Sequence, residues 1–159
     1  MLARVYDFAV FHYFTAFYKT ANKKRRAKLF RFGEKGDKKN ISNMNPVVLA
    51  FVGDAVYSLF VRERLAFGSD CKTGELNKLA TSYVKATAQA EFIKEIMPLL
   101  TEEELAVFKR GRNAKKPSKS KSASVAEYNM STGFEAVLGF LYMSGDYERL
   151  NIILNKGKE

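Results

Sequence analysis

From Asn45 onward the hydrophobic positions recur at helical spacing. Asn45 is a good N-cap and Pro46 suits the first position of a helix, and a predominantly apolar run follows from Val47 to Leu65. Gly68 comes just after this run, where a residue that tolerates a left-handed conformation can close a helix. The pattern therefore predicts a helix of about 20 residues.

The next stretch predicts one amphipathic helix. Apolar residues recur every three or four positions from Leu76 to Ile96, and Pro98 then stops the pattern. Polar residues fill the positions between them, so one face of this second helix is expected to pack against the core.

Two capping-box sequences mark the later helices. Thr101-Glu-Glu-Glu104 predicts a short helix that ends near Gly111, and Ser124-Val-Ala-Glu127 predicts a longer one that runs to Gly145. A last amphipathic helix follows over residues 147 to 154. Strand-like alternation is missing over any useful length of the sequence, so the predicted class is all-α.

The first 43 residues differ in kind from the rest. An aromatic stretch from Tyr6 to Tyr18 precedes a basic run from Lys19 to Asn40, and the segment holds 11 Lys and Arg against 3 Asp and Glu, whereas the remainder holds 16 against 14. We therefore predict two parts, a partly disordered extension over residues 1–43 and a helical domain over residues 44–159. The basic run is typical of a solvated tail, with contact to RNA or anionic lipid as the alternative.

Several classes of protein are disfavoured. Cys71 is the only cysteine, so this chain can form no internal disulfide and, with His12, no Cys/His zinc site. The early apolar stretch from Phe8 to Tyr18 is too short to span a bilayer, and its positive charges follow it instead of preceding it. We expect a cytoplasmic protein with no membrane segment and no small-molecule cofactor.

Two acids stand out within apolar helices. Asp54 is the lone acid of residues 49 to 61 and Glu135 is the lone acid of residues 133 to 141, and no Lys or Arg lies within four residues of either. Such helices are expected to be buried almost all round, where an uncompensated carboxylate is costly. The two acids compensate each other if they share a magnesium ion, which prefers oxygen ligands. The alternative is that each acid separately accepts hydrogen bonds or pairs with a distant Arg.

At these acids the chain resembles the ribonuclease III family. Phe51-Val-Gly-Asp-Ala55 resembles the core of the family signature, and Phe134-Glu-Ala-Val-Leu-Gly-Phe-Leu141 resembles its second acidic helix. The stretch from Asn77 to Ile96 is similar to the family's intermediate helix pair. Phe108-Lys-Arg-Gly-Arg-Asn-Ala-Lys115, with Tyr128-x-x-Ser-Thr132, resembles the Mini-ribonuclease III branch in particular.

The resemblance implies the ribonuclease III helical fold and a magnesium-dependent endoribonuclease. Asp54 and Glu135 would be its catalytic and metal-binding residues, while Ala50 and Thr132 stand where ordinary ribonuclease III has two more acids. The Mini branch shares that departure and also lacks a double-stranded-RNA-binding domain. The implied partners are double-stranded RNA, specifically a precursor of large-subunit ribosomal RNA, and a second copy of the chain in a homodimer. The implied products have 5′-phosphate and 3′-hydroxyl ends.

A basic segment is predicted to hold the RNA. Residues 112 to 124 lack an apolar period and any acid, so they predict an exposed loop, and seven Lys and Arg fall between Lys109 and Lys121. Double-stranded RNA is bound mainly through phosphates and ribose hydroxyls, which suits such a segment. The residues expected to bind RNA are Lys109, Arg110, Arg112, Asn113, Lys115 and Lys116. The alternative is an ordinary solvated connector.

Two rival functions remain. One is a non-catalytic RNA-binding module with a ribonuclease III-like fold, which the presence of both Asp54 and Glu135 disfavours. The other is a membrane-associated adaptor that uses residues 1–43, and it leaves the two acids unexplained.

Overall fold

The computed structural model describes residues 35–68, 70–115 and 123–156, and all regular structure within these ranges is helical. The elements are α2 (Lys38–Ser42), α3 (Pro46–Gly68), α4 (Thr73–Val84), α5 (Ala86–Ile96), a short 3₁₀ turn η1 (Met97–Leu99), α6 (Glu102–Asn113), α7 (Val125–Met143) and α8 (Tyr147–Leu154). No strand occurs in these ranges, which confirms the predicted all-α class. No helix in the described part of the chain is long and apolar enough to cross a membrane.

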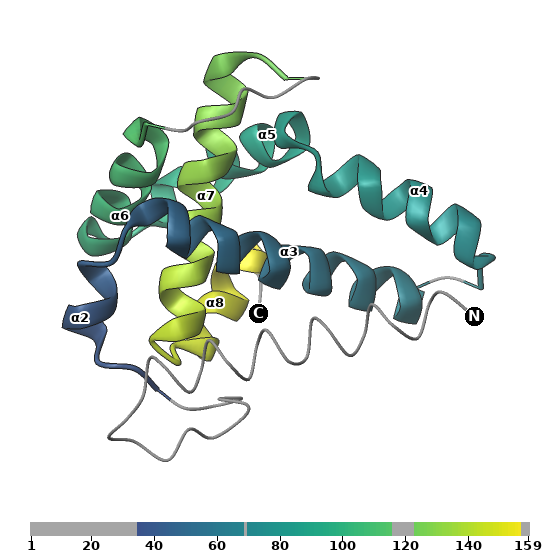
Figure 1. Ribbon diagram of the computed structural model, residues 1–159. Coiled ribbons are helices and arrows are strands. Elements are labelled where there is room, and N and C mark those ends of the chain that lie inside the picture. The colour runs from purple at the N-terminus through teal and green to yellow at the C-terminus, as the bar shows by residue number, and fades with distance from the viewer. Residues whose placement is uncertain (1–34, 69, 116–122, 157–159) are drawn as a thin grey trace, which may run out of the picture. The chain divides into compact units, whose positions relative to one another are not determined.

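The core is built around α7. This helix crosses α3, and α5 and α6 pack along it (Figure 1). Every residue from Ser131 to Leu141 is buried except Glu135, which is half-buried. Because a helix that is apolar on nearly all sides has to be covered on nearly all sides, the expectation of burial is confirmed for α7.

The helix starts agree with the sequence. The Asn45 Oδ1 atom accepts a hydrogen bond of 2.9 Å from the Val47 amide and so caps α3. Both capping boxes form their reciprocal hydrogen bonds: Thr101 with Glu104 in α6, and Ser124 with Glu127 in α7. The ends agree less closely, because α6 continues to Asn113, past the stop expected at Gly111.

The second predicted helix is in fact two helices. Lys85 has φ −65° and ψ 147°, an extended conformation that ends α4 and begins α5. The apolar period runs through this break because α4 packs on α3 while α5 packs on α7, so each needs an apolar face. The prediction of one continuous helix was wrong, whereas the resemblance to a helix pair is confirmed.

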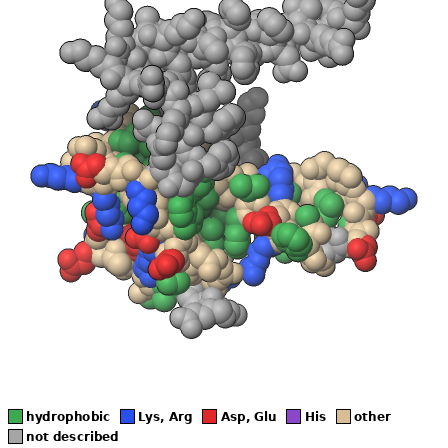
Figure 2. All heavy atoms as spheres, turned by 90° about the horizontal axis from the view of Figure 1, so that it is seen from below, with side chains coloured by type: hydrophobic (Ala, Val, Ile, Leu, Met, Phe, Trp, Pro, Cys, Tyr) green, Lys and Arg blue, Asp and Glu red, His purple; other side chains and the backbone are tan. Residues whose placement is uncertain are grey.

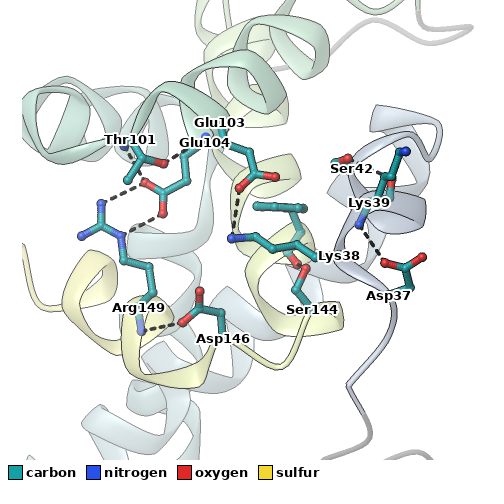
Figure 3. Close-up of polar contacts among 11 residues, drawn as sticks. Asp37, Lys38, Lys39, Ser42, Thr101, Glu103, Glu104, Ser144, Asp146 and Arg149 are labelled. Carbon is teal, nitrogen blue, oxygen red and sulfur yellow. Dashed lines mark hydrogen bonds and ion pairs between the residues drawn. The ribbon is translucent and has the colours of Figure 1, made fainter.

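α2 packs on the helical unit. The Ile41 side chain is buried, the Gly36 amide donates a 3.1 Å hydrogen bond to the Met143 carbonyl, and Lys38 pairs with Glu103 at 3.0 Å. Figure 3 shows the ion pair between Lys38 and Glu103. The compact helical unit therefore includes residues that we had assigned to the N-terminal extension.

The predicted boundary after residue 43 thus falls inside this unit, which includes the described residues from Lys35 onward. α2 is only five residues long and Ile41 is its one buried side chain, so its sequence carries no apolar period that would reveal the packing. The aromatic stretch and most of the basic run assigned to the extension lie outside the described residues.

A buried ion pair joins α6 to α8. The Arg149 Nε and Nη2 atoms donate hydrogen bonds of 2.8 and 2.9 Å to the two carboxylate oxygens of Glu104, which is 3% exposed (Figure 3). Burial opposes ionisation of Glu104, but the hydrogen bonds from Arg149 and Thr101 outweigh it and hold the pKa of this carboxyl below its ordinary value. The sequence revealed only the capping role of Glu104.

Candidate active site

Asp54 lies at the surface of α3. Its side chain is exposed, as are those of Phe51 and Leu59 on the same helix, at 80% and 66%. The expectation that α3 is buried almost all round was therefore wrong. An apolar helix face is expected to be buried against other residues. The described residues of the same chain leave this face of α3 exposed.

Asp54 and Glu135 belong to helices that touch backbone to backbone. A Cβ atom on Gly53 would lie 1.8 Å from the Glu135 carbonyl oxygen, and one on Gly139 would lie 2.0 Å from the Leu49 carbonyl oxygen. No side chain fits at either glycine, so Gly53 and Gly139 allow α3 and α7 to approach as closely as two helices can. This crossing brings the helix turns that carry the two acids side by side.

The surroundings of the acids fit a hard cation with few protein ligands. Within the described ranges no three His, Cys, Asp or Glu side chains gather in a metal-binding group, so Asp54 and Glu135 form at most a two-carboxylate site. Ala50 and Thr132 are both buried, and the Thr132 hydroxyl donates a 2.9 Å hydrogen bond to the Tyr128 carbonyl of its own helix. Magnesium suits two carboxylates, since it commonly keeps several of its waters.

The basic residues occupy a helix end and not only a loop. Lys109, Arg110, Arg112 and Asn113 belong to the last turns of α6, so the loop predicted to begin at residue 112 starts two residues later. Lys115 is exposed just beyond the helix, and Lys116 lies outside the described residues together with Lys119 and Lys121. We call Lys109, Arg112, Asn113 and Lys115 the basic end of α6.

Arg112 is held against the protein. Its guanidinium carbon lies 5.9 Å from the centroid of the buried Phe108 ring, and its Nε donates a 3.1 Å hydrogen bond to Asn113 Oδ1. These two contacts orient a half-buried side chain and use only one of its five N–H donors. The arrangement is suitable for bonding a phosphate.

Arg110 is engaged elsewhere. Its Nη1 and Nη2 atoms donate hydrogen bonds to the carbonyl oxygens of Ser42 and Met44, in the connection between α2 and α3. The sequence placed Arg110 among the RNA-binding residues, and its contact with residues more than sixty positions away left no local signal. Two of the five guanidinium donors are therefore committed to the protein's own backbone.

A second glycine contact sets the basic end of α6 against α7. A Cβ on Gly111 would meet the Thr132 carbonyl oxygen and the Gly133 Cα, both at 3.0 Å, and a Cβ on Gly133 would meet the Phe108 ring at 2.7 Å. The basic end therefore lies beside the part of α7 that carries Thr132 and, one turn on, Glu135. Both α3, which carries Asp54, and the basic end of α6 therefore pack against α7, the helix that carries Glu135.

The exposed face of α3 is apolar as well as acidic. Val48, Phe51 and Leu59 recur at helical spacing along it, and Phe67 near the helix end is 85% exposed. Figure 2 shows hydrophobic side chains at the surface in the middle of one face and toward the end formed by α3 and α4, with charged side chains around them. Exposed apolar surface of this extent is typical of an interaction site.

Comparison with known proteins agrees with this geometry. Residues 47–146 match the family model of the ribonuclease III domain. The chain is 46% identical to Mini-ribonuclease 3 of Clostridium tetani, over 77% of this chain and 82% of that protein, and 49% identical to Mini-ribonuclease 3 of Symbiobacterium thermophilum, over 72% and 88%. A crystal structure of a Fusobacterium nucleatum protein superimposes with a TM-score of 0.65 at 31% identity, covering 73% of this chain and 93% of that one. By sequence and fold together, the chain belongs to the Mini-ribonuclease 3 group of the ribonuclease III family of endoribonucleases.

Proposed function

We propose that this endoribonuclease cleaves double-stranded RNA with magnesium held by Asp54 and Glu135, and that it acts as a homodimer. The observation that carries the proposal is the α3–α7 crossing, because the glycine contacts at Gly53 and Gly139 place the acid-bearing turns of the two helices together. No other His, Cys, Asp or Glu side chain joins them into a larger group within the described ranges.

The two acids would have complementary surroundings for this work. Asp54 is exposed and open to substrate, while Glu135 is half-buried on the otherwise buried central turns of α7 and so has a fixed position. A bound magnesium ion supplies an activated water and stabilises the negative charge of a phosphodiester under attack. Ala50 and Thr132 add no carboxylate, so water would fill more of the coordination shell than in ordinary ribonuclease III.

The basic end of α6 would hold the RNA backbone. Arg112 and Asn113 lie on its last turn, Lys115 follows directly, and Lys116 extends the charge along the chain. Since phosphate contacts fix the position of a duplex without reading its sequence, these residues would place a strand beside Glu135 through the α6–α7 contact. We expect Lys109 to contribute long-range attraction more than a defined contact, because its side chain is exposed.

The apolar face of α3 would bind the same face of a second copy. Phe51, Val48 and Leu59 would be buried by a two-fold contact, which places the same patch on both subunits. Asp54 lies on the same helix, so the contact would hold the α3–α7 crossing of one subunit at a defined distance from that of the other. Cutting both strands of a duplex requires two cleavage sites, and each subunit of the dimer would supply one.

The specific substrate proposed is a precursor of large-subunit ribosomal RNA in the cytoplasm, with products that have 5′-phosphate and 3′-hydroxyl ends. This part rests on the resemblance to the Mini branch, in which the catalytic domain has no separate RNA-binding domain.

The test is a cleavage assay on a long RNA duplex, with magnesium and with a chelator, for the unaltered chain and for Asp54→Asn and Glu135→Gln. We expect cleavage only with magnesium and only when both acids are present. Duplex binding without any cleavage by the unaltered chain would instead support the alternative of a non-catalytic RNA-binding module.

A further inference from the structure

Arg110 connects two parts of the chain that are far apart in sequence. It lies in the last turns of α6, between Lys109 and Arg112, yet its guanidinium donates to the carbonyls of Ser42 and Met44. These carbonyls belong to the connection that leaves α2 and enters α3. One side chain therefore joins the helix proposed to hold RNA to the start of the helix that carries Asp54.

The connection needs this donor. The end of a helix leaves carbonyl groups without partners, and the Lys39 and Ile41 carbonyls of α2 are satisfied locally, by Asn43 Nδ2 at 2.9 Å and by the Met44 amide at 3.0 Å. For Ser42 and Met44 the partner is Arg110. A positive side chain is also favoured beside the negative end of a helix.

The same connection sets the start of α3. Met44 immediately precedes Asn45, whose side chain caps α3 and whose carbonyl accepts from the amides of Val48 and Leu49 at 3.0 and 3.1 Å. A shift of Met44 would therefore shift the cap. Asp54 follows nine residues after Asn45, about 13 Å along a rigid helix axis, so the position of the cap is transmitted to the acid.

The other side of Arg110 is equally fixed. The neighbouring Gly111 packs against Thr132 and Gly133 of α7, with no room for a side chain. α2 is anchored separately, by the buried Ile41 and by the Lys38 ion pair with Glu103 that is visible in Figure 3. Arg110 therefore joins α6, which packs on α7, to the connection between α2 and α3.

We infer that Arg110 is a positioning residue for the cleavage reaction, which aligns the start of α3 with the basic end of α6, and that it does not bind RNA. The inference rests on the proposed function for its effect on cleavage. It assigns a role different from that of Arg112 two residues away, although both are arginines of one basic segment.

The experiment compares Arg110→Ala, Arg110→Lys and Arg112→Ala in the full chain. Binding to an RNA duplex is measured over a series of salt concentrations, cleavage is measured at saturating RNA, and hydrogen exchange is followed at the amides of Val47, Val48 and Leu49. Ile153→Val, which trims a buried side chain of α8 far from this junction in sequence, is the control for a general loss of stability.

For Arg110→Ala we expect an unchanged salt dependence of binding, a kcat lowered about tenfold and faster exchange at the three amides, since small misplacements of reacting groups have large effects on rate. Arg110→Lys should be intermediate, because one ammonium group replaces two directed donors only in part. Arg112→Ala should flatten the salt dependence by about one phosphate contact.

Three results would overturn the inference. A salt dependence that flattens in Arg110→Ala, with kcat restored at saturating RNA, would make Arg110 an RNA ligand. A loss of kcat no larger than in the Ile153→Val control at equal stability would make it a structural residue only. If the unaltered chain cleaved no RNA, the proposed function would fail, whereas unchanged exchange at the three amides would by itself contradict the positioning role.

Discussion

Gly53 and Glu135 meet so closely that a methyl group on Gly53 would lie 1.8 Å from the Glu135 carbonyl oxygen. The neighbour is main chain, which cannot move aside as a flexible side chain can. The contact fixes the distance between α3 and α7, and with it the separation of the helix turns that carry Asp54 and Glu135.

Gly53→Ala should therefore destabilise the fold by about 3 kcal/mol or more, since it overpacks a buried helix crossing. Chemical denaturation would measure the change in the free energy of unfolding. Gly68→Ala is the matched control, because it lies on the same helix with no atom within 4 Å of the added methyl, and alanine there should be neutral or stabilising by up to about 1 kcal/mol. Equal stability of the two variants would mean that the helices can separate without cost.

Asp54→Asn and Glu135→Gln are each expected to reduce cleavage nearly to background, because each removes a proposed metal ligand. Asp54→Asn should change stability by less than about 0.5 kcal/mol, since the side chain is exposed. Glu63→Gln, another exposed acid of α3, serves as the control and should cleave normally. Activity within about threefold of the unaltered chain, under about 1 kcal/mol in the barrier, would exclude the altered acid as a metal ligand.

Replacing Arg112, Lys115 and Lys116 together by Ala should weaken RNA binding and lower the slope of log affinity against log salt by up to about three. The loss should lie mainly in binding, so saturating RNA should largely restore the cleavage rate. Cleavage measured against RNA concentration at two salt levels tests both parts. A kcat that stays low at saturation would instead place one of these side chains at the reacting phosphate.

Phe51→Glu should convert the proposed dimer to monomers, since it sets a charge in the middle of the apolar face of α3. Analytical ultracentrifugation would report the mass, and cleavage of both strands of a duplex should fall with it. Val125→Glu also alters an exposed apolar side chain, at the first residue of α7, and should leave the mass unchanged. If Phe51→Glu had the same mass as the unaltered chain, the two-fold contact would have to lie elsewhere.

The Glu104–Arg149 pair should make stability sensitive to acid. The folded state lowers the pKa of Glu104, so its contribution is present above the ordinary pKa of this carboxyl and is lost as the pH falls through the lower value of the folded state. Unfolding free energies measured from neutral to acid pH should therefore decline less steeply in Glu104→Gln than in the unaltered chain. Identical slopes would show that the pair does not govern acid stability.

The sequence by itself determined the helical class, the starts of α3, α6 and α7, and the two acids that stand alone within apolar helices. These features depend on neighbours three or four residues away, as in the Asn45 cap and the Thr101 and Ser124 capping boxes, so they can be read without knowledge of the fold. An acid inside an apolar run is likewise a local signal.

Only the tertiary structure decided which helix faces are covered and which distant residues meet. The same apolar period describes a face buried in the core, as on α7, and a face left open, as on α3 around Phe51, because hydropathy records the need for a partner and not its identity. Arg110 has the sequence context of an RNA ligand, but its bonds to Ser42 and Met44 depend on how α6 and α2 pack. The close approach of the helix turns that carry Asp54 and Glu135 likewise follows from a contact between two glycine-bearing helices, which no local pattern encodes.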